Sequence, residues 1–204
     1  VKMGENFRRK ARFVADGHKA NTPAAMTYSS VVSRDSVRIA LTIAALNDLK
    51  ILACDTHNAY LTADCRERAW IQAGPEFGSE AGTNMIVKKA LHGLKSSGAA
   101  FRAFLAETLD AMGCRPTCAD PDVWMRPAAK PNGFECYEHM LCYVDDVLCV
   151  SDDAAKSMKR IQADFKLKDD KIEEPDVCLG ATLAKMTLAD GTTCWSMSPE
   201  QCCK

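Results

Sequence analysis

The sequence lacks most of the patterns that assign a chain to an enzyme class directly. It holds no glycine-rich phosphate loop, no Ser/His/Asp triad, no internal repeat and no low-complexity linker. No apolar run approaches the ~20 residues that a membrane helix needs, so no membrane partner is expected. Charge of either sign is also not in excess, with 26 Lys and Arg against 27 Asp and Glu. That balance is unfavourable for binding nucleic acid over the whole surface, because neutralising phosphates needs Lys and Arg.

Eleven cysteines are present, but not in an arrangement that binds metal. There is no paired CxxC knuckle, and the four histidines do not cluster. An odd number of cysteines with no signal peptide predicts a reducing intracellular compartment. Three cysteines lie inside apolar runs, where we expect them to pack as small hydrophobes: Cys54, Cys142 and Cys149.

The charge is unevenly distributed along the chain. Residues 1–20 hold six Lys and Arg against two acids, a local excess of four positive charges. Such a segment is either a solvated basic end or a surface that contacts a template or nucleotide.

Length and hydrophobic patterning predict an α+β fold. At 204 residues and 47% hydrophobic content, the chain suits one domain or slightly more. Strands and helices mix without a βαβ rhythm, which indicates an antiparallel sheet with helices on one face. Predicted helices cover 36–49, 97–112 and 152–165, and predicted strands cover 50–54, 70–73, 85–89, 123–126, 135–144, 147–150, 177–185 and 192–197.

The helix over 36–49 is apolar on most sides, so we expect it to be buried, with Ser33 or Asp35 as its cap. The strand over 50–54 is expected at the centre of the sheet. Gly113 is expected to end the helix over 97–112.

The most informative stretch is Tyr143-Val144-Asp145-Asp146, set between two apolar runs that predict strands. Ionised carboxylates in apolar surroundings are disfavoured unless a cation compensates them. The pair would lie at a tight turn with its charge directed into a cleft, where a hard cation such as Mg²⁺ could bind. Asp-Asp is also an ordinary turn dipeptide, which is the alternative.

Asp55 ends another apolar run, far in sequence from the Asp pair. Two metal ions about 3.5–4 Å apart need carboxylates that come from different strands. Asp55 therefore completes a candidate two-metal site, although a strand-ending or helix-capping Asp is the more common arrangement.

Eight blocks in order resemble the reverse transcriptases of copia-type retrotransposons. The blocks run from residue 10 to residue 180, and Tyr143 to Asp146 matches the catalytic box without change. Asp55 to Leu61 is similar to Asp-Val-Lys-Thr-Ala-Phe-Leu, and Leu91 to Lys95 to Leu-Tyr-Gly-Leu-Lys. The remaining blocks are residues 10–15, 28–32, 70–77, 120–124 and 165–169 with 179–180.

The resemblance implies a fingers–palm portion of a Pol polyprotein over residues 1–197, with 198–204 as the start of a truncated thumb or tail. It implies RNA-directed DNA polymerisation, in which a primer 3′-hydroxyl attacks a dNTP with the help of two Mg²⁺ ions, or Mn²⁺ in their place. The implied ligands are Asp55 and Asp145, with Asp146 assisting.

The resemblance also implies nucleotide-binding residues. Tyr60 falls at the position of the aromatic that excludes a ribose 2′-hydroxyl, although it could equally be a core aromatic. The others are Lys10, Arg12, Gly93, Lys95 and Tyr143, for which solvated charges and plain loop positions are the alternatives. The implied partners are an RNA or DNA template with its primer, dNTPs and other parts of a Gag-Pol polyprotein. The implied location is the cytoplasm, in virus-like particles, with the nucleus as a second site.

The departures from the family pattern leave a second function open. The run Ser96 to Ala100 lacks the family's Gln, Pro and Arg, Asp16 stands where Lys is common, and His92 replaces Tyr. These changes, with the neutral charge and the missing thumb, favour an inactive remnant that at most binds nucleic acid. Another palm enzyme, such as a nucleotide cyclase, would explain the acids but not the flanking blocks.

Overall fold

The computed structural model describes residues 13–17 and 27–199, and the chain divides into two compact units. Unit 1 comprises Val1–Tyr28 and Tyr60–Phe101, and unit 2 comprises Ser29–Ala59 and Arg102–Lys204. Each unit is thus assembled from two separate stretches of sequence. The boundary at residue 197 that the sequence suggested stays a prediction.

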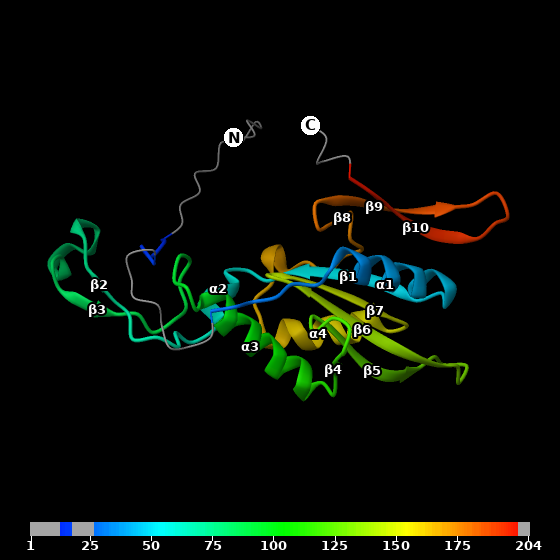
Figure 1. Ribbon diagram of the computed structural model, residues 1–204, viewed down its shortest axis with the longest axis horizontal. Coiled ribbons are helices and arrows are strands. Elements are labelled where there is room, and N and C mark those ends of the chain that lie inside the picture. The colour runs from blue at the N-terminus through cyan, green and yellow to red at the C-terminus, as the bar shows by residue number, and fades with distance from the viewer. Residues whose placement is uncertain (1–12, 18–26, 200–204) are drawn as a thin grey trace. The chain divides into compact units, whose positions relative to one another are not determined.

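Unit 2 is built on a five-stranded antiparallel sheet in the order β1-β7-β6-β5-β4 (Figure 1). Its strands are β1 (Lys50–Asp55), β4 (Arg115–Pro116), β5 (Val123–Ala129), β6 (Glu135–Tyr143) and β7 (Asp146–Ser151). The predicted hairpin of β6 and β7 is confirmed, and β7 also pairs with β1.

β1 lies at the edge of this order, so the prediction of a central strand is wrong. β1 is nevertheless apolar because another segment of the chain, and not a further strand, lies along its free side. On its free side, the amide of Ala53 donates to the carbonyl of Glu173 (2.8 Å), so a non-strand segment covers this edge.

Both faces of the sheet are covered, because every residue from Val147 to Ser151 of β7 is buried. Leu148 and Val150 belong to one core cluster with the inner face of α1 (Arg34–Leu46). Successive residues of a strand point to opposite faces. On the opposite face, Ser157 of α4 (Ala154–Asp164) donates to Glu138 of β6 (2.7 Å). The prediction of helices on one face is therefore wrong, since a strand without polar positions needs cover on both sides.

α1 begins at Arg34, two residues before the predicted start, and Ser33 is the one of the two predicted caps that caps it. The hydroxyl of Ser33 accepts a hydrogen bond from the amide of Ser36 (3.1 Å), which caps the helix. Its buried stripe consists of Val37, Ala40, Leu41 and Ala44. Ile39 and Leu46 are 60% and 78% exposed, so the predicted burial of this helix holds for one stripe only. One stripe is enough, because α1 packs on a single sheet face.

Asp120 fastens the loop before β5 to the start of α1. Its carboxylate accepts hydrogen bonds from the Ser33 amide (2.9 Å), the Ser36 hydroxyl (2.6 Å) and the Asp122 amide (3.1 Å). Burial acts to raise the pKa of Asp120, but these hydrogen bonds outweigh it and the pKa is lowered. The block around Asp120 therefore has a structural role in positioning α1.

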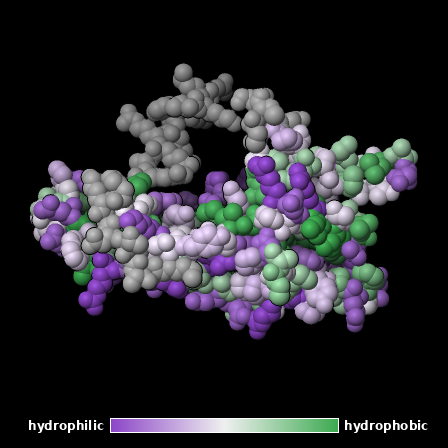
Figure 2. All heavy atoms as spheres, viewed as in Figure 1, coloured by the Kyte–Doolittle hydropathy of each residue, from purple (hydrophilic) through white to green (hydrophobic). Residues whose placement is uncertain are grey.

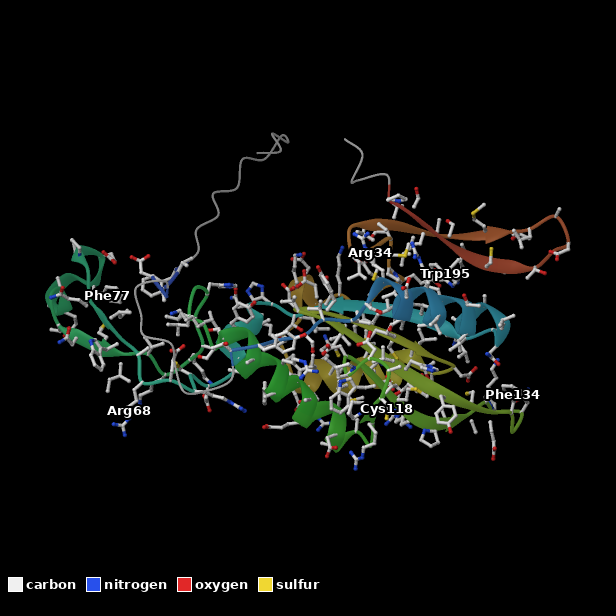
Figure 3. The ribbon with its side chains drawn as sticks, viewed as in Figure 1. Arg34, Arg68, Phe77, Cys118, Phe134 and Trp195 are labelled. Carbon is white, nitrogen blue, oxygen red and sulfur yellow. The ribbon has the colours of Figure 1, made fainter. Side chains whose placement is uncertain are left out.

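The predicted C-terminal hairpin is confirmed as part of a three-stranded sheet in the order β10-β9-β8. These strands are β8 (Val177–Cys178), β9 (Ala181–Thr187) and β10 (Thr193–Ser198). Trp195 of β10 packs against the core cluster of α1 and points from the hairpin toward that helix (Figure 3). Hydrophobic side chains are also visible on the hairpin's outer surface (Figure 2), where Met186 and Leu188 are about half exposed.

Unit 1 is smaller and contains a two-stranded antiparallel sheet, β2 (Trp70–Gln72) with β3 (Asn84–Ile86). The 3-10 helix η1 (Pro75–Glu80) lies in the connection, and α2 (Ala59–Thr62) lies at the boundary of the unit. α3 (Ser97–Ala111) begins in unit 1 and continues into unit 2. Among residues 13–17 and 27–199, no helix is long and apolar enough to cross a membrane.

Candidate active site

The candidate site begins at the tip of the β6–β7 hairpin. Tyr143 and Asp146 are the last paired residues, so the predicted tight turn is present, but it consists of Val144 and Asp145, and Asp146 belongs to β7. Val144 has φ of +52°, in the left-handed region that a β-branched side chain disfavours. Residues held in this way concentrate at functional sites, and the conformation persists only because the surrounding structure imposes it.

Asp55 ends β1 directly opposite Asp146 of β7. Residues opposed in an antiparallel pair project from the same face, with Cβ atoms about 4.5–5.5 Å apart. Both line a pocket of about 240 Å³ within unit 2. Two carboxylates that are 91 positions apart in the chain, at 55 and 146, thus meet at one site. The pair that faces across the strands is Asp55 with Asp146, whereas Asp145 lies in the adjoining turn.

Backbone hydrogen bonds hold this geometry. The amide of Thr56 donates to the carbonyl of Asp145 (2.7 Å), which joins the end of β1 to the turn. The next amide, of His57, donates to the carbonyl of Lys166 (2.8 Å). Thr56 is only 1% exposed, so the first of these bonds is shielded from water. The end of β1 is therefore fixed between the turn and the segment that follows α4.

That segment brings Lys168 to the site. Its ammonium nitrogen Nζ lies 2.5 Å from Oδ2 of Asp55. Lys168 begins the 3-10 helix η2 (Lys168–Asp170) and also lines the pocket. Sequence reasoning did not assign Lys168 to the site. The available signal was its position in the block 165–169, which was interpreted as a lead into the later hairpin.

The charges at the site perturb one another. Burial, then the charges of Asp145 and Asp55, raise the pKa of Asp146 to about 6, against the lowering effect of Lys168. Asp146 keeps an exposed surface, so its carboxyl remains accessible to a ligand. The pKa of Lys168 is raised by its hydrogen bond to Asp55 and by the negative charge of Asp55. The local potential therefore stays negative although Lys168 is present.

Cys54, next to Asp55, responds to the same potential. Burial, followed by the charges of Asp146 and Asp55, raises the pKa of its thiol to about 12. Burial is also the main cause of the raised thiol pKa values of Cys142 and Cys149. All three are buried in strands, as predicted, and their thiols stay protonated and unreactive at neutral pH.

The pocket carries six acids and two lysines. A hydrophobic wall that includes Val37, Leu141 and Leu148 supports it. A cavity with this charge attracts cations and repels a free polyanion. The acids are Asp55, Asp146, Asp169, Glu173, Glu174 and Asp176, and the lysines are Lys168 and Lys171.

The donor set fits a hard divalent cation in its chemistry. It offers carboxylate oxygens from two paired strands, a surplus of negative charge and one carboxyl whose pKa is raised by its neighbours. Within the described part of the chain, no three His, Cys, Asp or Glu side chains already converge closely enough to hold one ion. Binding would therefore require the carboxylates to adjust, and Asp55 to release Lys168.

Tyr60, expected to contact a nucleotide, packs within unit 1. Its ring lies 4.8 Å from that of His92 and 6.4 Å from that of Phe101, measured between centroids. Tyr60 is half-buried in this cluster, so part of its side chain stays exposed. Tyr143 lies in unit 2, is 37% exposed and lines the pocket beside Asp146.

Gly93 is a position of close backbone approach, and its neighbour there is protein backbone. Its φ is +92°, and a Cβ placed on it would lie 2.0 Å from the carbonyl oxygen of Ala15. The amide of Ala15 donates to the carbonyl of His92 (2.7 Å) across this contact. Lys95 is half-buried just before α3. Lys10 and Arg12 lie outside the described residues.

Comparison with known proteins gives one family. Residues 2–187 match the family described as reverse transcriptase (RNA-dependent DNA polymerase). The chain is 28% identical over 169 residues to the retrovirus-related Pol polyprotein from transposon TNT 1-94 of Nicotiana tabacum, covering 79% of this chain and 12% of that protein. It is 30% identical over 172 residues to the transposon Ty1-NL2 Gag-Pol polyprotein of Saccharomyces cerevisiae, covering 80% of this chain and 9% of that protein. The chain thus spans about a tenth of each relative, and the matches agree with the resemblance drawn from the eight blocks.

Proposed function

This chain belongs to the reverse transcriptase (RNA-dependent DNA polymerase) family, and we propose that unit 2 is the palm and unit 1 the fingers of such an enzyme. The reaction is attack of a primer 3′-hydroxyl on the α-phosphate of a dNTP, with pyrophosphate as the leaving group. The observation that carries the proposal is the direct opposition of Asp55 and Asp146 beside the Val144–Asp145 turn.

Asp55, Asp145 and Asp146 would hold two Mg²⁺ ions, or Mn²⁺ in their place. When bound, these ions supply a lowered pKa for the primer hydroxyl and charge neutralisation at the reacting phosphate. The protein contributes orientation. The Thr56–Asp145 backbone bond fixes the end of β1 against the turn, so that Asp55 and Asp146 face the same reacting group. Tyr143, on the same face as Asp146, would contact the nucleotide.

The charge of the pocket supports a requirement for cations. A triphosphate could not approach six carboxylates unless positive charge entered with it. Nucleotide and divalent ion are therefore expected to bind together at this site. Lys168 already supplies one positive charge in the pocket. It must release Asp55 as the nucleotide and the ion enter.

In unit 1, we propose Tyr60 as the aromatic that excludes a 2′-hydroxyl, and Gly93 and Lys95 as contacts to nucleotide or template. Lys10 and Arg12 keep the same proposed role. The proposed partners are a template with primer, dNTPs and the rest of a Gag-Pol polyprotein. The cytoplasmic and nuclear locations stay predictions.

A second candidate function is a remnant that binds nucleic acid without catalysis. The serines that replace the family pattern are used structurally here. The Ser96 hydroxyl donates to a carboxylate oxygen of Glu67 (2.6 Å), and the Ser97 hydroxyl donates to the carbonyl of Leu91 (2.6 Å). Both serines are buried, so neither is available to a template or phosphate.

Primer extension on poly-rA/oligo-dT with Mg²⁺ separates the two functions. The first predicts dTMP incorporation by the wild-type chain that is lost in Asp145→Asn. The matched control is Asp64→Asn, which removes an exposed acid paired with Lys89 and should retain activity. Oligonucleotide binding by a folded wild-type chain that gives no extension would support the remnant instead.

A further inference from the structure

The pocket beside Asp55 and Asp146 has a second part that the proposed reaction does not use. Its total volume is about 240 Å³, and its lining extends from the two carboxylates to the segment that leads into β8. Much of that lining is apolar, and a hard ion gains nothing from it because such ions prefer oxygen ligands. A ligand that fills the whole pocket must therefore carry apolar groups. The apolar wall includes Val37 of α1, Leu141 of β6, Leu148 of β7 and Val177 of β8.

One side of the pocket follows the free side of β1. Isolated bridges join Thr56 with Leu167 and Ala53 with Glu173. The two positions on β1 are three residues apart, which is about 10 Å along a strand. The charged side chains of the segment between these bridges are therefore distributed along the pocket, and among the described residues no three acids converge on one point. This distribution suits a ligand with several separated charges.

Half of the six acids in the pocket already contact a lysine ammonium. The pairs, measured from carboxylate oxygen to Nζ, are Asp55–Lys168 (2.5 Å), Glu174–Lys185 (2.8 Å) and Glu173–Lys171 (3.9 Å). Within 13–17 and 27–199, the other three acids have no ion-pair partner and keep an exposed surface: Asp146, Asp169 and Asp176. An ammonium group on an aliphatic chain thus fits the acids of this pocket, and three of them remain for further ammonium groups.

We propose that this pocket binds a linear aliphatic polyamine that carries three ammonium groups. The ammonium groups pair with the three acids that lack a lysine, and the methylene chain lies on the apolar wall. Burial of methylene groups is favourable, and this contribution distinguishes a polyamine from an inorganic cation. One ammonium contacts Asp146, so a polyamine and a divalent ion exclude each other there. The inference goes beyond the proposed function and does not rest on it, because the polyamine binds without metal, nucleotide or template.

The test is isothermal titration calorimetry of spermidine into the nucleic-acid-free chain, in metal-free buffer at pH 7.5. Spermidine, which has three ammonium groups, should bind at one saturable site, and added Mn²⁺ should displace it. Putrescine, which has two ammonium groups, should bind at least about five-fold more weakly, as expected for one ion pair lost at ~4 Å in water. Equal affinities for the two amines, or spermidine binding that Mn²⁺ does not displace, would overturn the proposal.

Two acids of the segment after α4 provide a matched pair for the electrostatic part. Both Asp170 and Asp176 are exposed, but only Asp176 lines the pocket. Asp176→Asn should weaken spermidine binding about five-fold. Asp170→Asn should leave it unchanged, and asparagine tolerates the φ of +52° at this position. Equal effects of the two substitutions would mean that only the overall charge of the chain attracts the amine, which contradicts a site in the pocket.

A second matched pair tests the apolar wall. Val177 lines the pocket, whereas Val31 does not, and each is 40% exposed. Val177→Ser should weaken spermidine binding about four-fold, as for one buried methylene, and leave Mn²⁺ affinity unchanged, whereas Val31→Ser should change neither. Spermidine binding that is insensitive to Val177→Ser would overturn the proposal. Spermidine binding by a chain that neither binds Mn²⁺ nor extends primers leaves the inference intact, whereas extension without saturable spermidine binding removes this inference alone.

Discussion

Nζ of Lys168 lies 2.5 Å from Oδ2 of Asp55, so an internal cation contacts a carboxylate proposed to bind metal. Both side chains keep contact with water, at 55% and 32% exposure, and the pair can therefore separate. Lys168 compensates part of the negative charge of the pocket, because six acids line it.

Lys168→Met should tighten Mn²⁺ binding. Removing a positive charge ~4 Å from a bound ion relieves at least ~1 kcal/mol of repulsion even in water, which corresponds to about five-fold or more in affinity. The measurement is a Mn²⁺ titration followed by electron paramagnetic resonance. The control is Lys171→Met, whose ammonium lies 3.9 Å from a carboxylate oxygen of Glu173 and should change affinity less. Unchanged or weaker binding by Lys168→Met would show that Lys168 does not compete with the ion.

Asp146→Asn should stabilise the protein at pH 7.5 in EDTA but not at pH 4. The folded-state pKa of Asp146 is about 6, above its ordinary value of 3.8. Below pH 4 the carboxyl of Asp146 is protonated in the folded and the unfolded state, so it does not lower the free energy of unfolding. As the pH rises from 4 to 6, only the unfolded state loses its proton, so stability falls, and the full cost is present above pH 6.

The expected gain at pH 7.5 is about 1 kcal/mol in the free energy of unfolding, because exposure to solvent screens the larger value that the shift alone implies. Urea unfolding at the two pH values measures it. Asp64→Asn is the control, because the pKa shift of Asp64 has the opposite direction: Lys89 lowers it. Removing the Asp64 carboxylate should therefore not stabilise the protein. Equal stability of Asp146→Asn and wild type at pH 7.5 would contradict the proposed repulsion.

Val144→Gly should raise stability by about 1 kcal/mol, because glycine adopts φ of +52° without strain. Little burial is lost, since Val144 is 39% exposed. The melting temperature should rise by about 2–4 °C. The control is Val177→Gly, at a β8 position that is 40% exposed and not among the positive-φ residues, where glycine should destabilise. A fall in melting temperature for Val144→Gly would mean that the turn carries no strain.

Local sequence patterns predicted much of the fold. The apolar runs on either side of Asp145 and Asp146 predicted the β6–β7 hairpin, and two strand segments around the turn Ala189-Asp190-Gly191 predicted the β9–β10 hairpin. The helix over Ser97–Ala111 was predicted from its apolar face and from Gly113. These features depend on residues close in sequence, so a single chain reveals them.

The features that the sequence did not reveal depend on distant contacts. β1 lies at the edge of the sheet, and the segment at Glu173 covers that edge. The burial of both faces of β7 becomes apparent only when the positions of α1 and α4 are known. Lys168 lies 113 residues from Asp55, and no local pattern links them. Likewise, the carboxylates were identified from the sequence, but the pairing of Asp55 with Asp146 follows from strand register.

The central claim, that the opposed carboxylates form a metal-binding centre, is tested most directly by Mn²⁺ binding to Asp55→Asn and Asp146→Asn. The account predicts that the wild type binds Mn²⁺ in competition with Mg²⁺ and that each substitution weakens binding about ten-fold or more, as for loss of a charged ligand. Glu174→Gln, which removes an acid of the same pocket that already pairs with Lys185, should bind nearly as well as the wild type. Equal Mn²⁺ affinity in Asp55→Asn, Asp146→Asn and the wild type would contradict the account.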